Sequence, residues 1–427
     1  MDCLLRRSMY SRAAGLALIS LAINFIEGTR LISIAPGNLY SLHMSTGSRM
    51  SKPPRYAAVD TLRGLAIFGM IWAHVHGLAP KMLPDGVTGA ISQMSGAATP
   101  LFMLIAGTTI AILNHGQMDS MRRRRFRLEY FLRGIGLVFI GLALLPWGGR
   151  VDIVLSYLGI TYILAIPFLY ASSKVLSICA TVIFAVSPIL ANLVAQALIL
   201  SPQLLHPQAS HNPLAFLVQW IFTGHAYHAT WLLPFLLLGI VAGRLLLLRK
   251  LPAKTMTLLG FGITAGVFLF FVRPQQDAVT YIRGGFTEMT FDIARAVTVY
   301  GLVCWLASAK NAKFSSWFQK IGMPISLAGR IPLTLYVLHV LLLFTFESAE
   351  WTLVRPHWLL PIMVFAICLG FAVLWGLTFG VGPVERLLGV FSLRHNLHWA
   401  FTSQPVQLTE LGFGQKKALQ PKQTFGL

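Results

Sequence analysis

Apolar stretches of about twenty residues recur along nearly the whole chain. Only 11% of the 427 residues are charged, against roughly 25% in an ordinary soluble domain. About 20 apolar residues are needed for a helix to cross a bilayer. The pattern therefore predicts an all-α fold, a polytopic transmembrane helix bundle of about ten spans. The candidate spans are 61–80, 91–114, 130–147, 152–171, 175–199, 229–248, 255–272, 290–308, 325–346 and 358–380.

Basic residues in the connections set the expected orientation. They gather in 115–133, 244–254 and 309–320, and again after residue 384. Lys and Arg concentrate in cytoplasmic loops, so both ends of the ten-span core should be cytoplasmic. This placement accounts for the net charge of +20 without nucleic acid, for which no recognised motif is present. We expect a multi-pass protein of the plasma membrane, which in a bacterium is the inner membrane.

The chain divides into three expected parts. Residues 1–54 are an N-terminal segment, which is a signal-like segment, an extra helix or sequence upstream of a later start at Met44 or Met50. Residues 55–390 are the transmembrane domain, and 391–427 are a cytoplasmic tail. The four cysteines have no ligand spacing, and the external His206, His211, His225 and His228 are loosely spaced, so we predict no metal site.

The first span carries three ionisable residues on one helix face. At 100° per residue, Asp60, Arg63 and His74 point the same way, and His74 lies about 16 Å beyond Arg63, roughly halfway across the hydrocarbon core. One interpretation is an i,i+3 ion pair and a packing histidine. The other is that Arg63 holds an anion at the cytoplasmic mouth while His74 acts as a base further in.

A late span repeats this arrangement with Arg330, Tyr336 and His339. Arg330 and His339 are nine residues apart, about half a turn around a helix, so they should not share one site unless Pro332 distorts the segment. Two spans therefore each place an Arg near the cytoplasmic end and a His further across the membrane. We select His74 and His339 as candidate catalytic residues.

Three other segments contain notable residues. Small residues over 95–109, with Pro100, predict close packing against the first span. Asp152 opens another span, either as a favourable helix start or as part of a site. Asp292 and Arg295 should form an i,i+3 ion pair that is structural.

Five motifs carry a resemblance to known proteins. The heparan-α-glucosaminide N-acetyltransferase family and its bacterial membrane relatives are similar in Val59-Asp-Thr-Leu-Arg-Gly-Leu-Ala66, Thr99-Pro-Leu-Phe-Met-Leu-Ile-Ala-Gly107 and Asp152-Ile-Val-Leu-Ser-Tyr-Leu-Gly-Ile160. The late Gly329-Arg-Ile-Pro-Leu-Thr-Leu-Tyr-Val-Leu-His339 and the terminal motif Gly382-Pro-Val-Glu385 resemble the carboxy-terminal signature of those bacterial relatives. The broader membrane acyltransferase family 3 is also similar. His74 matches the histidine that ends the first helix motif of that family, whereas the heparan enzymes have an asparagine there.

The resemblance implies an acyltransferase that takes an acyl group, acetyl in particular, from cytoplasmic acyl-CoA to a glycan or glycolipid across the membrane. It implies donor binding by Arg63, Arg330 and the basic cluster that includes Arg122 and Arg125. Asp60, Asp152 and Tyr336 would complete the substrate site. His74 or His339 would deprotonate the acceptor or carry the acyl group. The expected partners are the bilayer, acetyl-CoA or another acyl-CoA, and the acceptor, and we allow for a homodimer.

Two other function classes fit the same residues. A transporter or permease would use the buried Arg and His side chains as a substrate or proton path. A membrane scaffold would use the connections and not the histidines.

Overall fold

The structure is a computed structural model, which describes residues 57–75, 96–114, 119–149, 151–199, 213–224, 227–248, 250–269, 286–308, 320–348, 359–395 and 397. All regular elements in these ranges are helices. In chain order they are α2 (Ala57–Val75), α4 (Ala98–Leu113), α5 (Ser120–Leu144), η2 (Leu145–Trp147), α6 (Leu155–Leu164), η3 (Ile166–Phe168), α7 (Ser173–Ile199), α10 (Pro213–Val218), η4 (Gln219–Thr223), α11 (Ala229–Leu247), α12 (Ala253–Val267), α13 (Phe286–Ala307), α15 (Met323–Ala328), α16 (Pro332–Ser348), α17 (Leu359–Thr378) and α18 (Pro383–Phe391). Segment 1–54 and most of the 391–427 tail lie outside the described residues.

The all-α class is confirmed, and a helix overlaps each of the ten expected spans. Within the described residues, five helices are long and apolar enough to cross a membrane: Ser120–Trp147, Ser173–Leu198, Ala229–Leu247, Phe286–Ala307 and Leu359–Thr378. The count of about ten crossings and the orientation of both ends stay predictions.

The basic stretch before the third span is helical, which corrects its assignment to a connection. Helix α5 begins at Ser120 because the Asp119 side chain accepts a hydrogen bond from the Arg122 amide at 2.7 Å. The following arginines are good helix formers, so nothing in their propensity stops the helix. The arginines therefore line the first turns of a helix that runs on into an apolar segment.

The expected span at 152–171 is not one continuous helix. Helix α6 has only ten residues, about 15 Å, and the short η3 with Pro167 follows it. Asp152 lies before the N-cap residue Val154, so the prediction that Asp152 stands in the first helical turn is wrong.

The expected span at 325–346 is broken as well. Helix α15 ends at Ala328, a turn covers residues 329–331, and α16 begins at Pro332. Proline lacks an amide hydrogen and clashes with the carbonyl of the preceding turn, which favours the end of α15 before Pro332. The distortion that a shared Arg330 and His339 site would require is therefore present.

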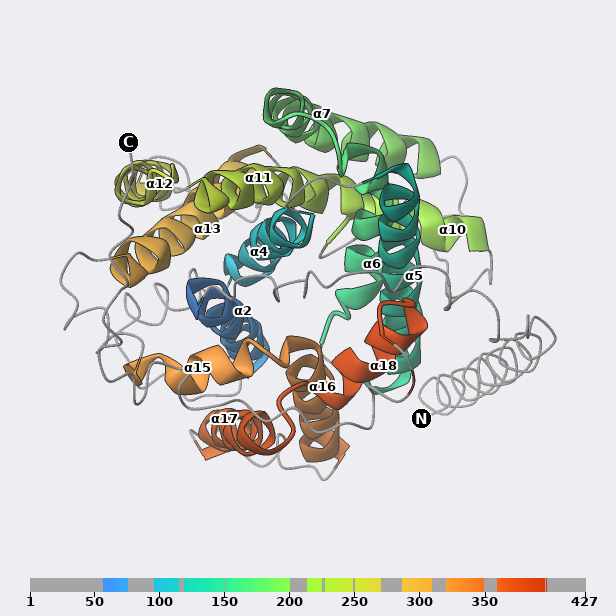
Figure 1. Ribbon diagram of the computed structural model, residues 1–427. Coiled ribbons are helices and arrows are strands. Elements are labelled where there is room, and N and C mark those ends of the chain that lie inside the picture. The colour runs from blue at the N-terminus through green and yellow to red at the C-terminus, as the bar shows by residue number, and fades with distance from the viewer. Residues whose placement is uncertain are drawn as a thin grey trace, which may run out of the picture.

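Helices α2 and α4 lie toward the middle of the bundle, and the other helices surround them (Figure 1). Backbones meet where glycines leave room: a Cβ on Gly64 would lie 1.9 Å from the Ile325 carbonyl oxygen of α15. A Cβ on Gly107 of α4 would lie 2.0 Å from the Leu236 carbonyl oxygen of α11. Helix α4 also contacts α2, as the small residues predicted, but its closest backbone approach is to α11.

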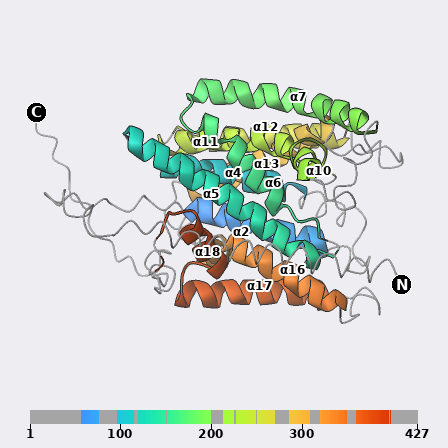
Figure 2. The same ribbon diagram turned by 90° about the vertical axis from the view of Figure 1, so that its right-hand side faces the viewer.

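Apolar side chains cover the outside of the bundle. Helices α7 and α17 lie on opposite sides of it (Figure 2). On α7, Ile178 and Ile189 are more than 60% exposed, and on α17 Leu374 is 70% exposed. Such surfaces are unfavourable in water and suit contact with lipid.

Candidate functional site

The first group of site residues lies where α2 begins and where α15 gives way to α16. Arg63 Nη1 donates to Asp60 Oδ1 at 2.8 Å, and Arg63 Nη2 donates to Thr109 Oγ1 of α4 at 2.5 Å. Arg330 Nε lies 3.6 Å from Asp60 Oδ2. We call Asp60, Arg63 and Arg330 the charged layer. In these contacts one largely buried carboxylate serves two guanidinium groups, which are the side chains best suited to bind a phosphate or carboxylate.

Close backbone contact holds the charged layer together. A Cβ on Gly329 would lie 1.8 Å from the Asp60 carbonyl oxygen, so no larger residue fits between α2 and the turn after α15. This contact brings Arg330 to Asp60 although 270 residues separate them in the chain. The break at Pro332 allows Arg330 and His339 both to face α2.

The second group is a pair of histidines. His74 Nδ1 and His339 Nε2 are 3.1 Å apart, the rings are within 8° of parallel, and their centroids are 5.3 Å apart. This centroid separation is close to the largest that such a contact between ring nitrogens allows. The rings therefore meet edge to edge, in the geometry of an in-plane N–H···N hydrogen bond.

The neighbours of His339 determine which nitrogens carry hydrogen. His339 Nδ1 lies 3.2 Å from the Leu335 carbonyl oxygen, which can only accept, so His339 Nδ1 carries the hydrogen. In the neutral ring His339 Nε2 is then the acceptor, and His74 Nδ1 must be the donor. The hydrogen-bond pattern thus makes His74 Nε2 the nitrogen without hydrogen, and therefore the basic nitrogen, of the two neutral histidines.

The two histidines also differ in burial. His339 is completely buried, whereas His74 is only partly buried. His74 is therefore the more exposed of the two histidines.

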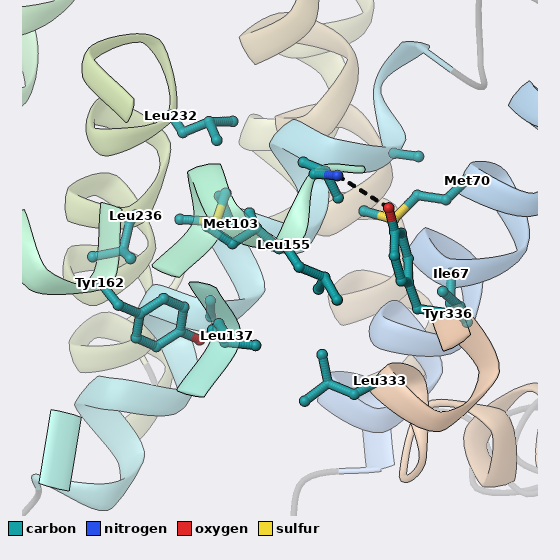
Figure 3. Packing of buried hydrophobic residues seen from close by; sticks show 14 of the residues in the cluster. Ile67, Met70, Met103, Leu137, Leu155, Tyr162, Leu232, Leu236, Leu333 and Tyr336 are labelled. Carbon is teal, nitrogen blue, oxygen red and sulfur yellow. Dashed lines mark hydrogen bonds between the residues drawn. The ribbon is translucent and has the colours of Figure 1, made fainter. Parts of the chain in front are cut away.

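Tyr336 is placed beside His339 but bonds to the backbone. Its ring meets that of His339 edge to face, with centroids 5.0 Å apart. Its hydroxyl accepts from the Val154 amide at 3.0 Å, the dashed line in Figure 3, among Met70, Ile67 and Leu155. Tyr336 therefore joins α16 to the start of α6.

No contact of the side chains of the remaining predicted residues with these two groups is seen among the described residues, although the Asp152 carbonyl oxygen lies 3.5 Å from the Tyr336 hydroxyl. The Asp152 side chain is exposed. Arg122 and Arg125 are exposed on α5, where Arg125 pairs with Glu129 at 3.2 Å. Their contacts here are with their own helix.

The structure adds residues that sequence reasoning missed. Thr109 lies in the small-residue span and was not singled out. Arg394 was assigned to the tail, yet the residue follows α18, which packs on α5 at Gly136.

Two further predictions concern residues away from the site. The expected Asp292 and Arg295 ion pair is confirmed. His206, His211 and His225 lie outside the described residues, and His228 caps α11 by accepting from the Trp231 amide. In the described part of the chain, no three His, Cys, Asp or Glu side chains gather in a group that could hold a metal ion.

A comparison with protein families identifies the family of the chain. A family profile described as an acyltransferase domain, Acyl_transf_3, matches residues 56–381. This chain belongs to the Acyl_transf_3 family. The match begins one residue before α2 and includes both histidines and the whole charged layer. The exposed apolar helices and this family together identify a membrane acyltransferase. No curated protein matches the chain.

The match confirms the broader of the two family resemblances. The likeness to heparan-α-glucosaminide N-acetyltransferases stays a prediction. Helix α18 lies beyond residue 381, so it is not part of the matched domain.

Proposed function

We propose that this protein moves an acyl group, acetyl in the simplest case, from cytoplasmic acyl-CoA to a hydroxyl or amine of an extracytoplasmic glycan or glycolipid. The observation that supports the proposal is the histidine pair, whose hydrogen bonds put the hydrogen of neutral His74 on Nδ1 and so make Nε2 its unprotonated, basic nitrogen. It acts in a multi-pass protein of the plasma membrane, the inner membrane in a bacterium. The bundle has about ten spans with both ends of its core cytoplasmic.

His74 serves as the general base and His339 orients it. The His74 imidazole takes a proton at Nε2 while its Nδ1–H stays bonded to His339 Nε2. His339 is fixed in turn by the Leu335 carbonyl. This arrangement of nucleophile, base and orienting group is the one that makes weak nucleophiles reactive.

The chemistry requires no group beyond donor and acceptor. The acceptor oxygen or nitrogen attacks the thioester carbonyl carbon and gives its proton to His74 Nε2. A new C–O or C–N bond forms, the C–S bond breaks, and the CoA thiolate leaves with the proton from His74. The products are the acylated acceptor and the free thiol. In a two-step variant, His74 Nε2 itself carries the acyl group before the acceptor attacks.

The charged layer binds the donor from the cytoplasmic side. Acyl-CoA is a polyanion, and Arg63 and Arg330 share one carboxylate, so phosphate groups balance their charge. Arg63 and His74 are eleven residues apart on α2, about 16 Å, a separation that would let the layer bind the donor near the cytoplasm while the base acts deeper in the membrane. The exposed arginines of α5 attract the donor at longer range.

Thiol release by the purified protein tests the proposal. Wild-type protein in lipid nanodiscs should release thiol from acetyl-CoA faster when cell-envelope glycan is added. His74→Ala should lower the rate by about 10²- to 10⁴-fold, the usual contribution of a general base. An unchanged rate in correctly inserted His74→Ala would refute the role of the pair. Solute uptake into proteoliposomes without thiol release would instead identify a transporter.

A further inference from the structure

Helix α16 begins at Pro332, directly after the turn at residues 329–331, and a carboxylate from another helix binds its first turn. Glu385 Oε1 of α18 accepts from the Leu333 amide at 2.6 Å and from the Thr334 amide at 3.2 Å. Glu385 Oε2 accepts from the Thr334 hydroxyl at 2.5 Å. The amides at a helix start have no partner within the helix, and here a distant side chain supplies it.

The backbone of α18 and the residue before it also take part in this contact. The Thr334 hydroxyl oxygen accepts from the Val384 amide at 3.2 Å. A Cβ on Gly382 would lie 2.2 Å from Glu385 Oε2 and 2.4 Å from Thr334 Oγ1, so the contact between these two side chains leaves no space for a side chain at residue 382. Figure 1 shows α18 between α16 and α5, where it can reach the start of α16. We call Glu385, Thr334 and Gly382 the clamp.

The clamp matters for the histidines because of where α16 starts. The turn at residues 329–331 interrupts the helix, so α15 does not set the direction of α16. His339 lies five residues beyond Thr334, about 7.5 Å along the axis. A hydrogen bond of 3.1 Å between ring nitrogens tolerates little movement of the helix that carries one of them.

We propose that Glu385 is a positioning residue, which anchors the start of α16 so that His339 Nε2 meets His74 Nδ1. The proposal rests on the proposed function for its catalytic consequence, but the geometry it concerns is independent of that function. Glu385 lies outside the matched family domain, so the segment after that domain completes the site. Burial raises the pKa of the Glu385 carboxyl more than its hydrogen bonds lower it. If the carboxyl is protonated, one oxygen still accepts from the two amides, and the other can donate to the Thr334 hydroxyl oxygen.

Three variants test the clamp. Glu385→Ala removes every acceptor. Glu385→Gln keeps an oxygen for the two amides, and its amide nitrogen can donate to the Thr334 hydroxyl oxygen. Ser172→Ala is the matched control, since Ser172 Oγ accepts from the Val175 amide at the start of α7, which carries no site residue.

The first readout is the kinetics of acyl transfer by purified protein in nanodiscs. Glu385→Ala should lower kcat about tenfold or more while KM for acetyl-CoA stays within about twofold, because the charged layer is not altered. Glu385→Gln should restore kcat to within about threefold of wild type, and Ser172→Ala should leave it unchanged. Wild-type kcat in Glu385→Ala, or equal losses in Glu385→Ala and Glu385→Gln, would overturn the proposal.

The second readout does not need activity. In protein labelled with ¹⁵N-histidine, the ring nitrogen shifts of His74 and His339 report their hydrogen bond. Glu385→Ala should change these shifts and Glu385→Gln should not; unchanged shifts in Glu385→Ala would overturn the proposal. If wild type transfers no acyl group, the proposed function fails, and the shifts still decide the clamp. Should Glu385→Ala not insert, Thr334→Val removes only the hydroxyl and should give smaller changes of the same kind.

Discussion

Replacing His339 separates its role from that of His74. His339 is completely buried and accepts one hydrogen bond, from His74 Nδ1, so its Nε2 has one task in the reaction. Leucine fills a similar volume without an acceptor, whereas glutamine places an amide oxygen near the former Nε2. When His74 gains a proton, that hydrogen bond becomes charge-assisted, which contributes about 1.5–3 kcal/mol.

This free energy corresponds to roughly a 10- to 150-fold loss of kcat in His339→Leu. His339→Gln should lose much less. The assay is thiol release from acetyl-CoA at saturating donor and acceptor, with the amount of folded protein measured by size exclusion. A kcat for His339→Leu within about twofold of wild type would refute the argument, and so would a glutamine variant as slow as the leucine variant.

Three other variants test the surroundings of the pair. Arg330→Lys should raise KM for acetyl-CoA about tenfold and leave kcat nearly unchanged, whereas Arg125→Lys on the exposed face of α5 should change KM less than twofold; equal effects in a titration of rate against donor would contradict the charged layer. Gly329→Ala should lower the thermal midpoint in detergent, because its methyl group would lie 1.8 Å from the Asp60 carbonyl oxygen; an unchanged midpoint would show that α2 and α15 do not meet this closely. Tyr336→Phe leaves a buried amide without its acceptor and should cost about 1–3 kcal/mol of stability; a loss under about 0.5 kcal/mol in denaturant titrations would indicate that the bond is absent.

The sequence was sufficient for the class of fold and for the residues on α2. Helical periodicity and spacing are local properties, so Asp60, Arg63 and His74 could be placed on one face without knowledge of any partner. The i,i+3 pair between Asp60 and Arg63 follows from that spacing, and the structure has it. The same reasoning allowed a shared site for Arg330 and His339 only if Pro332 broke the helix, and Pro332 does mark a break.

The contacts between helices could not be predicted from spacing. Nothing local indicates that Arg330 meets Asp60, or that His339 meets His74 with a particular ring nitrogen. These contacts depend on where the backbones approach, which glycines such as Gly329 decide. Glu385 was noticed only as part of a terminal motif, because its partners are the amides of a helix start about 50 residues away.

Local rules also failed where two signals competed. The run of arginines after Asp119 was assigned to a connection because of its charge, yet arginine favours helix and Asp119 caps it. Conversely, the apolar stretch after Asp152 looked long enough to cross the bilayer, but Pro167 follows a helix of only ten residues.

Transfer across a sealed membrane tests the central claim most directly. Vesicles would hold the glycan acceptor on the face opposite the basic connections, with acetyl-CoA labelled in its acetyl group supplied on the other face. We predict that wild-type protein moves the label to the acceptor inside, with one thiol released for each acetyl group, and that the His74→Ala/His339→Ala variant does not. Labelling of the enclosed acceptor at the wild-type rate by that double variant would contradict the account.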